Sequence, residues 1–203
     1  VMFTDANIAL SSRMLMMGSG ADLIASDYKI SREMLDNLAY TSQQRAAKAT
    51  REGLFKSIIP IENPIKKRTV TQDECIRESI SLEDLAALPP AFAELGHAGV
   101  DALQLNEYPK LNKIAHHHTA GNSPAMADAA ALVLIGDETL QENLETVPVA
   151  RVIAVATTCN DPLQVVSGCT AATAKLMSEQ NLTVKGIDLF EIHEAFFVQI
   201  HVK

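Results

Sequence analysis

The stretch that decides the fold reads RVIAVATT at residues 151–158, TAATAKLMSEQ at 170–180 and IDLFEI at 187–192. The outer two segments are apolar runs of strand length, and the middle one carries apolar residues at helical spacing. A strand, a helix and a second strand in this order predict a right-handed crossover in a parallel sheet. The second half of the chain is therefore expected to be α/β.

Working outward, the segment just before this unit shows the same kind of pattern. An Ala-rich stretch at 125–131 predicts a helix, and the apolar run at 132–135 predicts a strand that ends at Gly136. The polar passage at 140–148 is typical of a connector between two α/β units.

The first half predicts mixed helix and loop up to about residue 118. Residues 1–17 are rich in Met and lack a clean period, and GSG at 18–20 predicts a break, so we expect a loop that enters a helix. Ser31 is a good N-cap for a long helix, and Gly53 ends that helix well.

Two shorter elements follow the long helix. The apolar run at 54–61, closed by prolines, predicts a strand and a turn. The SLED sequence at 81–84 resembles a capping box, and it predicts a short helix that Pro89 and Pro90 stop.

Composition restricts the class of protein. The 203 residues are 47% hydrophobic and 21% charged, which is typical of a globular protein, and the net charge of −8 argues against a nucleic-acid partner. No apolar run approaches the roughly 18 residues of a membrane span, and the start of the chain lacks the order of a secretion signal, so we expect a cytoplasmic protein. Cys75, Cys159 and Cys169 are odd in number and widely spaced, which favours reduced thiols.

Three consecutive histidines, at 116–118, are the first candidates for a metal site. Adjacent residues of an extended chain point to opposite faces, so at most two of the three rings can face one ion. No carboxylate lies close to them in the sequence. We therefore favour a structural or surface role and expect no metal site.

His193, in EIHEAF at 191–196, is the more interesting imidazole. It follows a predicted parallel strand where a helix would begin, which is where open α/β sheets usually bind ligands. Helix N-terminal N–H groups favour developing negative charge and a neutral imidazole, although a structural histidine is the alternative. Cys159 and Cys169 have no Gly-rich turn or adjacent base in the sequence, so inert thiols are favoured over nucleophiles.

Several segments, in order along nearly the whole chain, resemble one family, the thiolases (acetyl-CoA C-acyltransferases). Residues 17–55 resemble the family's M-G-x-x-A-E, I-S-R-E-x-x-D and S-x-x-R-A-x-x-A patterns. The other matching segments are DECIR at 73–77, SLEDLAALPPAF at 81–92, HTAGNSPAMADAAALVLIGDE at 118–138 and IDLFEIHEAF at 187–196. The last carries His where many members have Asn, a form found in some fatty-acid β-oxidation thiolases.

The resemblance implies a layered α/β/α/β/α fold made of two similar halves, present here incompletely, with a mainly helical loop domain that covers coenzyme A. Residues 1–118 would be the loop domain. Residues 119–145 would end the N-terminal half, and residues 146–203 would begin the C-terminal half.

The activity that the resemblance implies is thiolysis of 3-ketoacyl-CoA by coenzyme A, and its reverse Claisen condensation, in fatty-acid β-oxidation. Coenzyme A and acyl-CoA are then substrates, and no covalently bound cofactor is expected. His193 would help to bind the thioester oxygen and stabilise enolate-like charge. Arg77 would lie near the nucleotide part of coenzyme A. The residues that match positions along the pantetheine are Ala120, Ser123, Ala195 and Phe196.

The chain also departs from the family pattern. The family's nucleophilic Cys, its G-H-P histidine and its C-terminal acid-base Cys fall on no residue of this chain. Pro124 stands where many members have Ser, and Ala129 replaces a Gly. The alternative is therefore a noncatalytic acyl-CoA-binding or scaffolding subunit. Incomplete halves would leave strand edges uncovered, so we expect a homo-oligomer or a partner chain.

Overall fold

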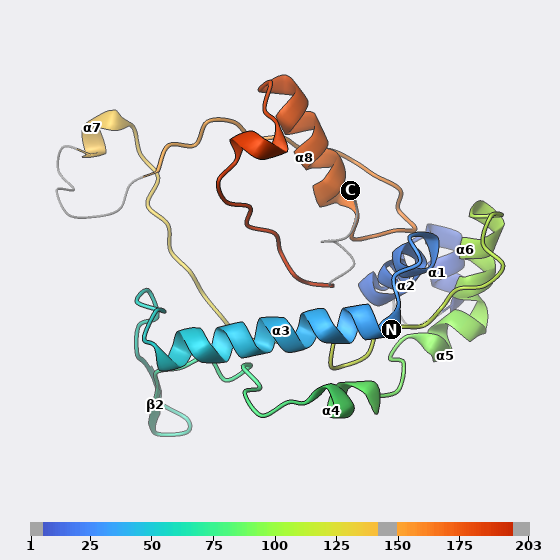
Figure 1. The fold of residues 1–203 in the computed structure, drawn as a ribbon, viewed down its shortest axis with the longest axis horizontal. Helices are drawn as coiled ribbons and strands as arrows, with labels where there is room; N and C mark the ends of the chain where they lie inside the picture. The colour runs from blue at the N-terminus through green and yellow to red at the C-terminus, as the bar shows by residue number, and fades with distance from the viewer. Residues whose placement is uncertain (1–5, 142–149, 197–203) are drawn as a thin grey trace.

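The computed structural model describes residues 6–141 and 150–196 (Figure 1). A long central helix, α3, has short helices at one end and a β-hairpin at the other, while α8 lies on the opposite side of α3 from α4 (Figure 1). The helices are α1 (Ala6–Ser12), α2 (Met17–Asp27), α3 (Arg32–Arg51), α4 (Leu82–Ala86), α5 (Ala93–Leu95), η1 (Gly96–Val100), α6 (Asp101–Glu107), α7 (Glu138–Gln141), α8 (Gly168–Glu179) and η2 (Val184–Gly186).

The predicted long helix is confirmed as α3. The Ser31 side chain accepts a hydrogen bond from the backbone N of Met34 at 3.2 Å, which caps the first turn. Beyond its end, Gly53 has a φ of 65°, a conformation that glycine adopts without steric cost. Leu35 and Ala39 lie on its buried face, so packing as well as capping stabilises this helix.

Two other helix predictions are also confirmed. The capping box forms at the start of α4, where Ser81 Oγ accepts from the Asp84 backbone N and the Asp84 carboxylate accepts from the Ser81 backbone N, each at 3.0 Å. The amphipathic stretch at 170–180 lies mostly within α8. No helix among the described residues is long and apolar enough to cross a membrane.

The prediction of a loop and a break at residues 1–20 is wrong where the structure describes it. α1 occupies part of the Met-rich stretch, and α2 runs straight through GSG at 18–20. A β-carbon on Gly20 would lie 2.4 Å from the carbonyl oxygen of Gln164, and one on Gly18 would lie 2.0 Å from the ring of Phe92. These glycines therefore allow close packing around a helix and do not end one.

Within residues 6–141 and 150–196, two apolar clusters lie on either side of α2. One joins α2 to α3, α4 and the C-terminal part of the chain, and its buried residues are Ala21, Ile24, Ala25, Ile30, Leu35, Ala39, Leu85, Val166 and Phe196. The other joins α2 to η1 and the chain on either side, and its buried residues are Leu15, Leu23, Val100, Ile114 and Leu163. α2 is thus buried along most of its length, and it fixes distant parts of the sequence beside one another.

The strands predicted at 132–135, 151–158 and 187–192 are not part of any sheet in the described structure, which is a correction. The sheet assigned among the described residues is an antiparallel pair, β1 (Ile61–Asn63) and β2 (Arg68–Val70), in the register Ile61↔Val70. A strand needs a neighbour for its backbone hydrogen bonds, and the described residues supply none for these segments. They run as irregular chain (Figure 1), and Leu132 is 99% exposed.

Two more local predictions are corrected. The stretch at 54–60 is turn and irregular chain, and the strand begins only at Ile61. The Ala-rich stretch at 125–131 is exposed and not helical, because a short helix needs a surface to pack against and none is present among the described residues. Most of the connector predicted at 140–148 lies outside the described residues.

Candidate functional site

The loop at 119–123, where a pantetheine contact is expected, has its shape fixed by a buried amide. Asn122 Oδ1 accepts a hydrogen bond from the Thr119 backbone N at 2.9 Å. Its Nδ2 donates to Asp36 Oδ1 on α3 at 2.8 Å and to the His117 carbonyl oxygen at 3.1 Å. Because Asn122 is fully buried and its amide is bonded at both ends, the loop is held rigidly on α3.

The buried carboxylate of Asp22 holds the histidine triplet that precedes this loop. Asp22 Oδ1 accepts from the backbone N of His117 and of His118, each at 3.1 Å, and from the His118 ring Nδ1 at 2.6 Å. Asp22 Oδ2 lies 3.0 Å from the Nδ1 of His116. The triplet thus has a carboxylate partner that lies far away in the sequence, and two of its rings face that one group.

Charge and burial compete at this carboxylate. Burial raises the pKa of Asp22, but the hydrogen bonds from His116 and His118 outweigh it and hold the pKa below its usual value. The hydrogen bond to Asp22 raises the pKa of His116, and the negative charge of Asp101 adds to the effect. The geometry favours a charged Asp22 at neutral pH, and it gives His118 the structural role that the sequence favoured.

Arg77 lies against the 119–123 loop. Its Nη2 donates to the carbonyl oxygen of Gly121 at 2.9 Å, and its backbone N donates to Gln43 Oε1 on α3 at 2.6 Å. Its side chain nevertheless remains on the surface. The structure therefore places the predicted cation beside the predicted pantetheine loop, although the two are 44 residues apart in the sequence.

The segment that carries His193 is anchored to the same region. The ring of Phe196 is 2% exposed and stands edge-on to His118, with ring centroids 5.3 Å apart. Ala195 packs against the same apolar cluster. Glu194 Oε2 accepts a hydrogen bond from Ser42 Oγ of α3 at 2.8 Å. Figure 1 shows this segment descending from α8 toward α3.

His193 itself is exposed, in contrast to its anchored neighbours, and so is Ala120. Ser123 is half-buried, and its Oγ has no hydrogen-bond partner in the described structure. Two hollows of about 160 and 410 Å³ in the described surface are lined by other residues, so neither contains the predicted site. The described residues thus do not enclose His193.

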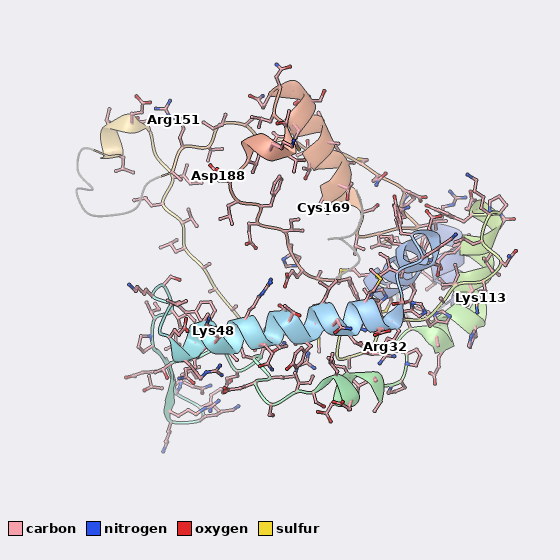
Figure 2. All side chains as sticks on the ribbon, viewed as in Figure 1. Arg32, Lys48, Lys113, Arg151, Cys169 and Asp188 are labelled. Atoms are coloured by element: carbon pink, nitrogen blue, oxygen red, sulfur yellow. The ribbon has the colours of Figure 1, made fainter. Side chains whose placement is uncertain are left out.

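The cysteines take no part in this arrangement. All three are free, Cys75 half-buried and Cys159 and Cys169 exposed. Cys169 lies at the N-terminal end of α8, and Figure 2 shows it away from Arg32 at the start of α3.

Comparison with known families decides the assignment. The family described as "Thiolase, N-terminal domain" matches residues 2–107, and "Thiolase, C-terminal domain" matches residues 146–203. The chain belongs to the thiolase family. The resemblance of motifs set out above is therefore confirmed.

Curated relatives of this thiolase chain agree with that assignment. A "Probable acetyl-CoA acyltransferase" of Staphylococcus aureus is 33% identical over 90% of this chain and 42% of the relative. A "3-ketoacyl-CoA thiolase" of Aliivibrio fischeri is 36% identical over 91% of this chain and 44% of the relative. The mitochondrial "Trifunctional enzyme subunit beta" of Bos taurus is 37% identical over 91% of this chain and 34% of the relative. The chain thus spans less than half the length of these relatives.

A solved thiolase shows the same fold. The Bacillus anthracis acetyl-CoA acetyltransferase superposes with a TM-score of 0.73 at 28% identity, over 92% of this chain and 43% of that structure. The chain therefore carries part of the thiolase-like α/β fold, including the mainly helical portion.

Sequence reasoning missed the buried polar groups that shape this candidate site, Asp22, Asp36 and Asn122. One signal for the first was present in the sequence. Asp22 is an acid within the apolar run ADLIA, and a buried acid requires polar partners. An acid in an apolar run indicates that polar partners exist but not which residues they are. The partners of Asp22 are His116, His117 and His118, which lie 94 to 96 residues away in the sequence.

Proposed function

We propose that this chain is part of a thiolase that cleaves 3-ketoacyl-CoA with coenzyme A in fatty-acid β-oxidation, and that catalyses the reverse condensation. Coenzyme A and acyl-CoA are its substrates, with no covalently bound cofactor. The observation that carries this proposal is the junction at His118, where the ring of Phe196 packs directly before the 119–123 loop. Two motifs of the thiolase pattern, far apart in the sequence, meet there on α3.

The proposed roles follow from the chemistry and position of each side chain. An exposed imidazole at His193 donates a hydrogen bond to the thioester oxygen, and this bond strengthens as enolate charge develops. The Arg77 guanidinium binds phosphate through charge-assisted hydrogen bonds while its contact with Gly121 fixes its position. The residues proposed to contact pantetheine are Ala120, Ser123, Ala195 and Phe196.

The proposed division of the chain stays as the sequence predicts it: a loop domain at 1–118, the end of the N-terminal half at 119–145 and the start of the C-terminal half at 146–203. The exposed apolar segments at 132–135 and 151–158 are proposed as strands whose neighbours lie in another part of the protein or another subunit. We also propose a cytoplasmic location, which cell fractionation tests.

An assembly larger than one chain is the expected solution state. Leu132, Val133, Leu134 and Ile135 are between 70% and 99% exposed, which is unfavourable for an isolated soluble chain. Sedimentation equilibrium should give a mass of at least twice 21.9 kDa. A monodisperse monomer at micromolar concentration would contradict the proposed association.

Two measurements on the 203-residue chain test the proposed function. Loss of acetoacetyl-CoA in the presence of coenzyme A should not be catalysed, because the family's nucleophilic Cys and G-H-P histidine match no residue here. Calorimetric titration should nevertheless show saturable coenzyme A binding. Arg77→Ala should weaken that binding roughly tenfold, as expected for the loss of a charge-assisted hydrogen bond.

Arg45→Ala is the matched control for Arg77→Ala, since Arg45 is an exposed arginine of α3 outside the proposed site. Its coenzyme A affinity should equal that of the unchanged chain. Equal weakening by both substitutions, or no binding at millimolar coenzyme A, would refute the proposed site.

The alternative function is a noncatalytic acyl-CoA-binding or scaffolding subunit. The unmatched nucleophile favours it, as does the open surface around His193. The test is to mix the chain with a polypeptide that carries the missing catalytic groups. Restored thiolysis that is lost in His193→Ala would support the proposed enzymatic function. Binding without any restored turnover would favour the scaffold.

A further inference from the structure

A cluster of three metal-ligand side chains lies outside the candidate thiolase site. His97 on η1, Asp101 at the start of α6 and His116 each offer one ligand atom, and these atoms all lie within 4.8 Å of one another. His116 Nε2 is 3.1 Å from Asp101 Oδ2. The rings of His97 and His116 are perpendicular, at 87°, with centroids 5.4 Å apart.

The hydrogen bond to Asp22 orients His116 for ligand binding. A carboxylate accepts hydrogen bonds, so the His116 Nδ1 that lies 3.0 Å from Asp22 Oδ2 carries a hydrogen. In the neutral ring the lone pair is then on Nε2, which faces Asp101 Oδ2, another acceptor. Two acceptors at this distance repel each other unless a positive charge lies at the contact. A second proton on the ring or a metal ion provides that charge.

A second observation points to a ligand at this cluster. Asp101 Oδ1 is buried and has no hydrogen-bond partner among the described residues, so it is an acceptor that a metal-bound water can satisfy. A β-carbon on Gly96 would lie 2.5 Å from Asp101 Oδ1 and from the ring of His116. The glycine therefore keeps the space beside both ligands free of side-chain atoms.

We propose that His97, Asp101 and His116 bind one divalent transition-metal ion, with Zn²⁺ the best match and water as the fourth ligand. Two imidazoles and a carboxylate suit Zn²⁺, and they disfavour Ca²⁺ and Mg²⁺, which take oxygen ligands. Asp22 then completes a carboxylate–histidine–metal arrangement, in which a carboxylate accepts a hydrogen bond from the second ring nitrogen of a ligating histidine and fixes the orientation of the ring.

The three ligand atoms, which lie within 4.8 Å of one another, must move slightly closer together to bind one ion. Zn²⁺ ligands lie at about 2.0–2.2 Å from the metal, so tetrahedral ligand atoms lie roughly 3.4 Å apart. Asp101 and His116 are already close to that separation. His97 is exposed, so its side chain can turn inward without disturbing the core. The bound ion would join the start of α6 to the segment that leads into the 119–123 loop, and it would stabilise the fold by binding to the native state.

The test uses the untagged full chain, freed of metal by a chelator and then titrated with Zn²⁺ in competition with a chromophoric chelator. One ion should bind per chain, and Co²⁺ should give the visible absorption of a tetrahedral site with nitrogen and oxygen ligands. His97→Ala should weaken Zn²⁺ binding at least tenfold while leaving the folded state intact. His193→Ala removes an equally exposed histidine outside the cluster and should leave the Zn²⁺ affinity unchanged.

Two results would overturn the proposal: no Zn²⁺ binding by the unchanged chain, or equal Zn²⁺ affinity in His97→Ala and the unchanged chain. The first would leave Asp101 and His116 as a pair that binds no metal ion. The outcome is independent of the proposed thiolase activity, because none of the three ligands belongs to the site around His193.

Discussion

Asp22→Asn is expected to lower the free energy of unfolding by about 3 kcal/mol, since breaking a buried ionic network costs roughly 3–5 kcal/mol. The substitution keeps the shape of the side chain but removes its charge. An amide that keeps its oxygen toward His118 turns its NH₂ toward the Nδ1 of His116, where two donors then meet. Reversing the amide places the same conflict at the backbone N–H groups of His117 and His118.

Asp27→Asn is the matched control, because Asp27 is an exposed carboxylate at the end of the same helix. Its effect should stay within about 0.5 kcal/mol, which is normal for a surface substitution. Urea unfolding followed by circular dichroism measures both variants. If Asp22→Asn proves as stable as Asp27→Asn, the Asp22 network does not hold the histidine triplet in place.

The features that were predictable from the sequence are those that short segments determine by themselves. The N-cap at Ser31, the capping box at Ser81 and the apolar spacing of α8 each involve residues a few positions apart. Their physical causes, backbone donors capped by side chains and apolar residues on one helix face, are visible in the local sequence. The family assignment was predictable for a different reason, the ordered succession of motifs.

The strands could not be predicted in the same way. The apolar run at 151–158 has the length and composition of a buried strand, and these properties favour strand formation wherever a neighbouring strand is available. Whether a ladder forms depends on a neighbour, and the described residues contain none for this segment. The helix through GSG at 18–20 is not predictable for a related reason, since the contacts that require glycine come from Phe92 and Gln164, which lie far away in the sequence.

The buried hydrogen bonds of the candidate site also join residues that lie far apart in the sequence. The sequence predicts a structural or surface role for the histidine triplet but not its partner, and His118 is fully buried against Asp22. The junction of Phe196 with this ring joins the last described residue to the middle of the chain. Only the resemblance of motifs placed Arg77 and the 119–123 loop in one site, and the structure brings them into contact.

The Phe196 junction leads to the second large effect. Phe196→Ala should destabilise the chain by about 3–5 kcal/mol, because truncating a buried aromatic residue loses its transfer free energy and leaves a cavity. The lost contacts include the edge-on packing on His118 and on Phe92, whose ring centroid lies 6.2 Å away. Chemical unfolding gives the loss directly.

Phe190→Ala distinguishes this junction from a general need for an aromatic residue in the segment. Phe190 is 43% exposed, so its truncation should cost less than about 1 kcal/mol. Hydrogen exchange adds a local readout, since Phe196→Ala should speed exchange in the 119–123 loop, where the N–H groups of Thr119 and Gly121 are hydrogen-bonded, while Phe190→Ala should leave the loop unchanged. Unchanged protection of the loop in Phe196→Ala would mean that Asn122 and Asp22 hold it without the aromatic contact. In that case Phe196 positions only the segment that carries His193. The 119–123 loop and the His193 segment, which are both proposed to contact coenzyme A, are then held in place independently of one another.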